Sequence, residues 1–328
     1  MAEWLYEAGI GEERAILVAH GAIIAARVEW GEPIRAGLVT DARLIAKSGG
    51  ARRGLARLGD GGEVLVDALP HEANEGDMLR LRIVRPALAE RGRTKRAQAR
   101  HDPTAACTPA PTLRDELQRG PLPVRPVRVA GLEFADNGWD ELTEQALTGE
   151  IAFAGGSLTL SPTPAMTLID VDGYGPATAL ALAAVAPIAA ALRRLDVGGS
   201  VGIDFPTLAE KRDRQAVDAA LGIALADWRG ERTAMNGFGF VQLVSRLERP
   251  SLLVRYARRC PAQARILLRH AERVSEPGTL ILIAPPALRR TVSRAWEAEL
   301  VRRTGRRIEW REDAGLALEA AFAQAVPS

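Results

Sequence analysis

Two short apolar segments that end in aspartates, joined by a long alanine-rich segment, constrain the fold of this chain most strongly. Residues 166–171 and 200–205 are predicted strands, and residues 177–195 between them are a predicted helix. A strand, a helix and a second strand in this order form a β-α-β unit with parallel strands. The pattern therefore predicts an α/β sheet, followed by a further helix over residues 208–227.

Acidic residues stand where these predicted strands end, with Asp170 and Asp172 in the first and Asp204 in the second. Ligands of parallel α/β sheets bind at the carboxyl ends of the strands. If the strands are neighbours, the charges of Asp170 and Asp204 repel each other, and a hard divalent cation relieves that repulsion. Carboxylate oxygens favour Mg²⁺, with Mn²⁺ as the alternative. The competing interpretation is that Asp172 starts a turn and Asp204 caps the following helix.

The segment after the first aspartates also imitates part of a dinucleotide-binding pattern, Gly173-Tyr174-Gly175. Its third glycine position is Thr178, and Asp170 and Asp172 would repel the pyrophosphate that such a loop binds. A nicotinamide enzyme is therefore disfavoured.

The first hundred residues favour β-structure. Residues 14–19 and 22–30 flank His20-Gly21, which predicts a hairpin with a tight turn. Glycine-rich turns separate the later apolar runs, which predicts a five-stranded β-barrel of OB or S1 type. These runs are residues 36–46, 54–58, 63–68 and 78–84. A basic run with Arg93, Lys95 and Arg96 follows, either as a solvated edge of the barrel or as a phosphate-binding arm.

The whole pattern predicts a multidomain α/β protein. Its expected parts are an N-terminal β-hairpin (1–30), an OB/S1-like barrel with a basic arm (31–100), a proline-rich linker (101–126), an α/β catalytic domain with a β-α-β metal site (127–259) and a small α/β C-terminal module (260–328). In the last two parts, strands are expected at residues 238–244, 279–283 and 307–310, and helices from Pro261 and over 287–302.

Charge, cysteines and hydropathy restrict the environment. The net charge is only +2, so attraction to a polyanion depends on where the arginines lie. Two distant cysteines, Cys107 and Cys260, and the lack of a signal-peptide pattern favour the cytoplasm. The longest apolar stretch, residues 177–192, contains Pro187 and precedes two arginines, which predicts a buried helix and no membrane association.

Several segments together resemble the ribonuclease E/G family. Residues 155–173, GGSLTLSPTPAMTLIDVDG, resemble the family stretch from Gly-Gly through Thr-Glu-Ala to Ile-Asp-Val-Asn. Residues 203–205 after Gly198-Gly199 resemble its second acidic strand, and residues 236–246, NGFGFVQLVSR, resemble its Leu-Gly-Leu-Val-Glu-Met-Thr-Arg stretch. Residues 3–11 and the barrel region extend the resemblance to the N-terminal part. The combination is much more specific than any single match.

The resemblance implies a Mg²⁺-dependent endoribonuclease that cleaves single-stranded RNA with metal-activated water. It makes Asp170, Asp172 and Asp204 the catalytic and metal-binding residues, although Asp172 stands where the family has asparagine. The family glutamate of Thr-Glu-Ala is Pro164 here. These departures keep an alternative open, a non-catalytic RNA-binding paralogue that retains the fold.

Two further departures concern zinc and the RNA 5′ end. Family members share one Zn²⁺ between subunits through a Cys-Pro-x-Cys pair, whereas here Cys260-Pro261-Ala262 is followed by Gln263. No zinc is expected, and any homodimer would form without a zinc link. The segment before Gly155 is short, so the family's 5′-monophosphate sensor is expected to be missing.

RNA binding is expected to depend on basic side chains. No aromatic residue occurs between Trp30 and Phe134, so the predicted barrel lacks the base-stacking rings usual in single-strand binders. Arginine and lysine would then contact the RNA backbone, the alternative for each being a solvated side chain. The candidates are Arg52, Arg53, Arg93, Lys95 and Arg96 in the barrel region, and Lys211, Arg212, Arg214 and Arg246 near the acidic site.

Overall fold

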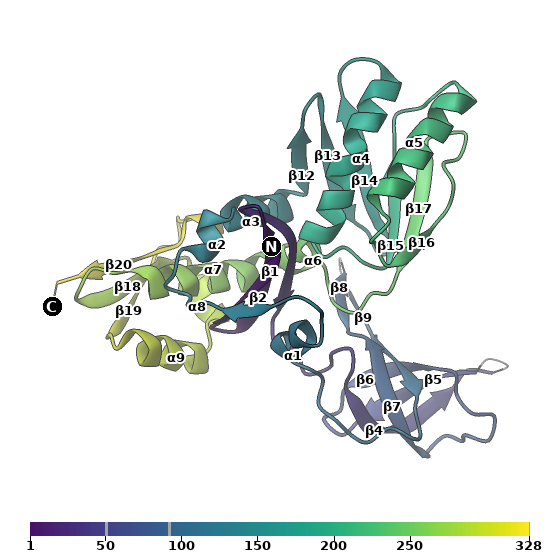
Figure 1. The fold of residues 1–328 in the computed structure, drawn as a ribbon. Coiled ribbons are helices and arrows are strands. Elements are labelled where there is room, and N and C mark those ends of the chain that lie inside the picture. The colour runs from purple at the N-terminus through teal and green to yellow at the C-terminus, as the bar shows by residue number, and fades with distance from the viewer. Residues whose placement is uncertain (50–51, 91–92, 328) are drawn as a thin grey trace.

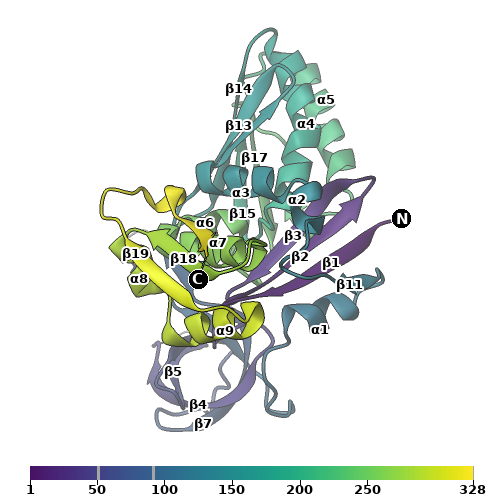
Figure 2. The same cartoon turned by 90° about the vertical axis from the view of Figure 1, so that its left-hand side faces the viewer.

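The computed structural model describes residues 1–49, 52–90 and 93–327. They form a mixed α/β protein with a four-stranded sheet, a closed five-stranded barrel, a six-stranded sheet, a three-stranded sheet and a two-stranded ribbon. Figures 1 and 2 show the barrel and the six-stranded sheet at opposite ends, with the four-stranded sheet between them, and in Figure 1 the three-stranded sheet projects to the left. The expected mixed α/β architecture with a β-barrel is thus confirmed.

The N-terminal sheet contains the expected hairpin and two additional strands. Its strands are β1 (Glu3–Gly9), β2 (Glu12–Ala19), β3 (Ala22–Glu29) and β11 (Val124–Pro126), with β11 parallel to β1. His20 and Gly21 between β2 and β3 have φ of 52° and 73°, as a tight two-residue turn requires. Buried Arg14 donates to Glu7 across β1 and β2 at 2.6 Å, and its guanidinium lies over the ring of Phe134.

The barrel closes in the order β10-β6-β5-β4-β7. The strands are β4 (Val39–Lys47), β5 (Arg53–Leu58), β6 (Glu63–Asp67), β7 (Met78–Arg85) and β10 (Ala97–His101). The first four match the expected apolar runs. The basic run instead forms β9 (Arg93–Lys95), paired with β8 (Leu88–Glu90), and then β10. Strand β10 belongs to the barrel because Ala97 and Ala99 are buried in its core.

The proline-rich segment after the barrel departs from the expected exposed linker, because it contains α1 (Leu113–Gln118) as well as β11. Thr112 caps α1 through a capping box with Asp115. Leu113 and Leu117 of this helix pack against Trp4 of the N-terminal sheet. Two helices that the sequence did not predict follow, α2 (Glu133–Asp136) and α3 (Trp139–Thr148).

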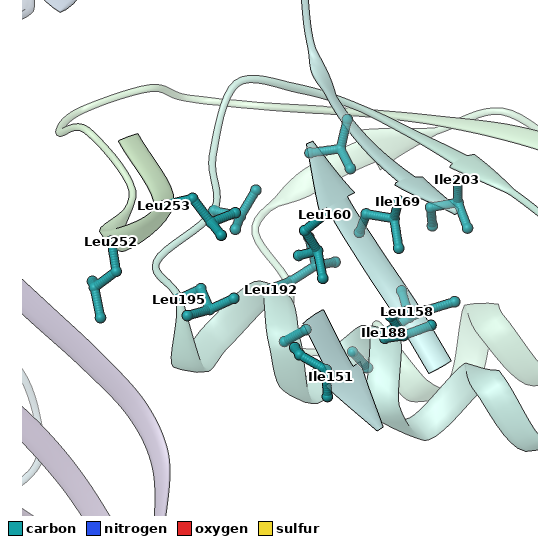
Figure 3. Close-up of a cluster of buried hydrophobic side chains, with 14 of the residues drawn as sticks. Ile151, Leu158, Leu160, Ile169, Ile188, Leu192, Leu195, Ile203, Leu252 and Leu253 are labelled. Carbon is teal, nitrogen blue, oxygen red and sulfur yellow. The ribbon is translucent and has the colours of Figure 1, made fainter. Parts of the chain in front are cut away.

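The six-stranded sheet has the order β12-β13-β14-β15-β17-β16. Its strands are β12 (Glu150–Phe153), β13 (Gly156–Pro162), β14 (Thr167–Gly173), β15 (Ser200–Asp204), β16 (Gly230–Arg232) and β17 (Phe240–Ser245). The parallel pair β14–β15 is joined by α4 (Ala177–Arg194), as predicted, and α5 (Lys211–Ala224) follows. Both helices cover one face of the sheet, where Ile169 and Ile203 pack near Ile188 (Figure 3). The other face is not covered by these helices.

Helix α4 is the one helix of the described residues that is long and apolar enough to cross a membrane, with mean hydropathy 1.4. Its residues Ala181, Ala184, Val185 and Ile188 are buried against the sheet. It is therefore a core helix of this sheet, as predicted.

The C-terminal part follows the expected order of helices and strands. Its elements are α6 (Leu252–Tyr256), α7 (Arg259–Arg273), β18 (Thr279–Ala284), α8 (Pro286–Thr291), α9 (Arg294–Thr304), β19 (Ile308–Glu312), the 3₁₀ helix η1 (Leu318–Ala320) and β20 (Phe322–Val326). The helix expected over residues 287–302 is divided in two, because Ser293 caps a new helix, α9. Strand β20, which was not expected, completes the three-stranded sheet.

Candidate functional site

The three predicted acidic residues lie on the uncovered face of the six-stranded sheet. Asp170 of β14 and Asp204 of β15 are paired in the register of these parallel strands. Neighbouring strands lie about 4.8 Å apart, and paired residues point to the same face. Asp172 is two residues further along β14 and so shares that face, and all three side chains are exposed. The structure therefore brings Asp170, Asp172 and Asp204 together.

These acids repel one another. In the described part of the chain, no arginine, lysine or histidine forms an ion pair with them. The pKa of Asp170 is raised above its ordinary value, first by desolvation and then by the charge of Asp172, a hydrogen bond with Asp172 and the charge of Asp204. A bound cation would remove this repulsion.

The donor set fits a hard divalent cation, because it consists of carboxylate oxygens. Among residues 1–49, 52–90 and 93–327, no three acidic, histidine or cysteine side chains already converge as a complete metal site. Mg²⁺ does not require one, since it is usually held by one or two carboxylates while water and substrate phosphate take its other positions. The pair Asp170 and Asp204 supplies two carboxylates on one face of the sheet, with Asp172 beside it.

Mg²⁺ or Mn²⁺ is expected to raise the midpoint of thermal unfolding, because the cation binds the folded chain alone. At a concentration 100 times Kd, such binding stabilises by about 2.7 kcal/mol. The double variant Asp170→Asn, Asp204→Asn should show no shift, whereas Asp140→Asn, a change at an exposed acid of α3, should shift like the wild type. Differential scanning fluorimetry with the cation or with EDTA measures this. An equal shift in the double variant would contradict the site.

Two exposed aromatic side chains flank the acids. Tyr174 is 94% exposed and Phe238 is 80% exposed, the two most exposed aromatic residues of the described chain. Tyr174 directly follows β14, and Phe238 stands two residues before Phe240, which is paired with Asp204. Since β15 lies between β14 and β17, the two aromatics belong to strands about 10 Å apart. Both aromatics lie at the same end of the sheet as the acids, where β14 and β15 end.

Hydrogen bonds from backbone amides order the turns that carry both aromatics. The amides of Phe238 and Phe240 donate to Asn236 Oδ1 at 2.9 and 3.0 Å, and Gly239 in the same turn has φ of 90°, which glycine adopts readily. The amide of Tyr174 donates to the carbonyl of Gly155 at 3.1 Å. An aromatic ring presented on an ordered turn can stack on a planar partner at little cost in conformational entropy.

A glycine creates an apolar floor beside Asp204. A Cβ at Gly202 would lie 2.5 Å from Cζ of Phe240 and 3.0 Å from both Leu168 Cδ2 and Met166 Sδ. The missing side chain therefore leaves room for the Phe240 ring next to the acids. Tyr174, Phe238 and Phe240 were not predicted as site residues, because the sequence drew attention only to the lack of aromatic residues in the barrel. The Gly-Tyr-Gly that follows Asp172 was the available signal.

The basic candidates of the barrel region are mostly engaged within the protein. Arg53 pairs with Asp67 at 2.9 Å, and Arg96 pairs with Glu63 at 3.3 Å. Arg52 donates to the carbonyl of Leu69, and Lys95 also interacts within the protein. Arg93 lies in β9, and its side chain is outside the described part of the structure. The structure does not bring these five residues to the acids.

Of the candidates expected near the acids, Lys211 and Arg212 are exposed at the start of α5, directly after the loop that follows Asp204. Arg214 donates to the carbonyls of Leu208 and Ala209 and so stabilises that loop.

The expectation that Arg246 lies near the acids is wrong. Phe240 is paired with Asp204, and β17 runs antiparallel to β15, so Arg246 lies beyond the opposite end of the sheet. Six residues of strand separate it from Phe240, or roughly 20 Å. The local sequence did not show this, because the direction of β17 depends on its partner strand.

The site thus combines the paired carboxylates Asp170 and Asp204, an apolar floor and two exposed aromatic side chains. The basic side chains Lys211 and Arg212 lie at the start of α5, after the loop that follows Asp204. Such a surface can hold a cation between carboxylates and planar groups on either side of it. No protein-family model matches this chain, and no curated protein matches it either.

Proposed function

We propose that the protein is a divalent-cation-dependent endoribonuclease of the ribonuclease E/G type that cleaves single-stranded RNA. The observation that carries the proposal is the register pairing of Asp170 with Asp204 on an uncovered sheet face. Acids that repel one another there would also repel a phosphodiester, unless a cation neutralises them. An uncovered sheet face suits an extended single strand rather than a small enclosed substrate.

The finer layout follows the same proposal. The barrel is assigned to the OB or S1 type because it closes with five strands and a parallel pair, β6 with β10. Residues 127–259 would form the catalytic domain, with the barrel and its basic ribbon guiding RNA and residues 260–328 as the C-terminal module. The proposed location is the cytoplasm.

Each residue has a role in this proposal. A divalent cation at the site would supply an activated water and neutralise charge on the phosphodiester. Asp170 and Asp204 hold that cation, and Asp172 adds negative charge beside it. Tyr174 and Phe238 stack on bases on either side of the reacting phosphate, while Lys211 and Arg212 contact the backbone.

The test is incubation of the full chain with labelled single-stranded RNA of mixed sequence in Mg²⁺ and in EDTA. Cleavage in Mg²⁺ alone supports the proposal. RNA that is bound but not cleaved in both conditions supports the second candidate, a non-catalytic RNA-binding paralogue. The aspartate at position 172, where the resemblance implies asparagine, favours that candidate.

Removal of either exposed aromatic ring is expected to weaken RNA binding. Stacking on one base contributes about 1–3 kcal/mol, so Tyr174→Ala or Phe238→Ala should raise Kd about 5- to 150-fold. Fluorescence anisotropy with Ca²⁺ in place of Mg²⁺ measures Kd, because this hard cation can still neutralise the acids. Phe322→Ala, at a 43% exposed aromatic of β20, is the matched control and should leave Kd unchanged. Equal Kd values for all three variants would show that neither Tyr174 nor Phe238 stacks on bases.

A further inference from the structure

A large cavity lies at the end of the six-stranded sheet opposite to the acids. The N-terminal sheet, α1, the end of α4 and the residues after β17 border this cavity, which is open to solvent and has a volume of about 1120 Å³. Trp4 and Trp228 line it together with six arginines, Arg27, Arg119, Arg193, Arg229, Arg246 and Arg249. A second cavity of about 490 Å³ adjoins it on the barrel side and shares Gly37, Arg246 and Glu248 with it.

Arg249 forms ion pairs with three of the nearby carboxylates. Arg249 is 9% exposed, lies 3.1 Å from Glu29 and 3.5 Å from Asp196, and also pairs with Glu116. Glu116 and Asp196 are wall residues of the cavity. Arg249 carries one positive charge against these three carboxylates, so Glu116 and Asp196 still offset part of the charge of neighbouring arginines such as Arg27.

The remaining wall has an excess of positive charge. Within the described ranges of the chain, five of its arginines have no carboxylate within 4.0 Å, namely Arg27, Arg119, Arg193, Arg229 and Arg246. Asp227 and Glu248 are the wall carboxylates that form no ion pair there. In total the wall has six arginines against four carboxylates, Glu116, Asp196, Asp227 and Glu248, which is an excess of two positive charges.

Arg27 shows that this excess has a cost. It lies on β3 with its guanidinium 5.1 Å from the centroid of the Trp4 ring, and it is only partly exposed. Its pKa is lowered, first by desolvation and then by the charge of Arg249. A cation that is partly buried without an ion-pair partner is costly, and an anionic ligand would offset that cost.

We infer that this cavity binds the sugar-phosphate backbone of single-stranded RNA. Guanidinium groups match phosphate oxygens through paired N–H donors, and Trp228 offers a ring to a base. A free nucleotide would leave part of the space empty, because pockets for small ligands have about 300–1,000 Å³ and the two adjoining cavities here extend toward the barrel. The identity of the ligand rests on the proposed function. A strand held here would reach the acids by crossing the sheet, roughly 20 Å away.

The test compares two double variants of the full chain. Arg193→Gln, Arg229→Gln removes two unpaired, exposed arginines of the cavity. Arg290→Gln, Arg294→Gln removes the same charge from exposed positions on α8 and α9. Kd for labelled single-stranded RNA is measured by anisotropy in EDTA at several salt concentrations, so that cleavage does not enter.

The cavity variant is expected to raise Kd roughly tenfold, since hydrogen bonds to charged groups are lost. It should also reduce the slope of log K against log salt by about 0.7 per arginine removed, whereas the control variant should keep the wild-type slope. The single variant Arg246→Gln should reduce the slope by about 0.7, which keeps the test valid if the double variant folds poorly.

Equal Kd and slope in the cavity and control variants would overturn the inference, as would a wild type that binds no single-stranded RNA. It would also be overturned if AMP or ATP bound in a cavity-dependent way while RNA did not. A wild type that binds RNA through the cavity but never cleaves it would refute the endonuclease proposal and support the cavity. If the wild type cleaves RNA and the cavity variants bind RNA like the wild type, the result would support the endonuclease proposal and refute the role of the cavity.

Discussion

Replacement of Asp204 by asparagine is expected to reduce RNA cleavage by roughly 10³-fold. The side chain is exposed at the end of β15 and has nearly the same shape as asparagine, so the fold should be retained. The variant removes one of the two carboxylates paired across β14 and β15. Cation catalysis contributes several kcal/mol, and each factor of ten in rate corresponds to about 1.4 kcal/mol.

The measurement is the single-turnover rate of cleavage of labelled single-stranded RNA in excess Mg²⁺. Asp140→Asn is the control for the loss of one exposed carboxylate and should cleave like the wild type. The thermal midpoints of both variants in EDTA verify folding. An Asp204→Asn variant that cleaves at the wild-type rate would rule out the proposed catalytic site.

Substitution of Gly11 by alanine is expected to lower the free energy of unfolding by about 2–4 kcal/mol. Gly11 lies in the turn between β1 and β2 with φ of 71°, where an L-residue costs about 1 kcal/mol. A Cβ there would lie 2.3 Å from Cζ2 of Trp296 in α9. Overpacking of this kind costs about 1–3 kcal/mol more.

The Trp296 ring cannot easily move aside. The guanidinium of Arg265 lies 4.6 Å from the Trp296 centroid and 4.2 Å from the Trp30 centroid, and it donates to the carbonyl of Gly11 at 2.9 Å. This cluster joins the N-terminal sheet to the C-terminal part. Gly11→Ala should therefore weaken the contact between these two parts as well as the turn.

Gly21→Ala is a matched control, since Gly21 has φ of 73° in the next turn of the same sheet and a Cβ there would meet nothing within 4 Å. It should cost only about 1 kcal/mol, the conformational part. Urea unfolding followed by tryptophan fluorescence compares the two variants. An equal loss of unfolding free energy in both variants would show that the contact with Trp296 does not restrict the side chain at position 11.

The fold elements that the sequence predicted are those with strong local periodicity. The β-α-β unit around α4 and four barrel strands were recognisable because their apolar residues recur at the spacing of a helix or a strand. The sequence left β10 open between a solvated edge of the barrel and a basic arm, because its buried residues Ala97 and Ala99 are small and its arginine dominates the composition; the structure supports the barrel edge. Short elements such as β12, β16 and β20 carry too few residues for a periodic signal.

The candidate site was predictable in part. Asp170 and Asp204 were identifiable because each ends an apolar strand, and their pairing follows from two adjacent parallel strands. Phe238 was not, because a sequence does not show which aromatic residues remain exposed, whereas the glycines on both sides of Tyr174 were a signal for an exposed ring. Arg246 was assigned to the wrong end of the sheet, because its position depends on the antiparallel pairing of β17 with β15.

The sequence by itself determined the parallel pair of strands that carries Asp170 and Asp204, because hydrophobic periodicity and chain connection act over neighbouring residues. Only the tertiary structure decided where the arginines gather. Arg27, Arg193 and Arg246 come from distant segments and meet because the N-terminal sheet packs beside the end of α4. Arg249 is the wall arginine that pairs with carboxylates, namely Glu29, Glu116 and Asp196. These residues are far apart in the sequence, so no local pattern predicts the contacts.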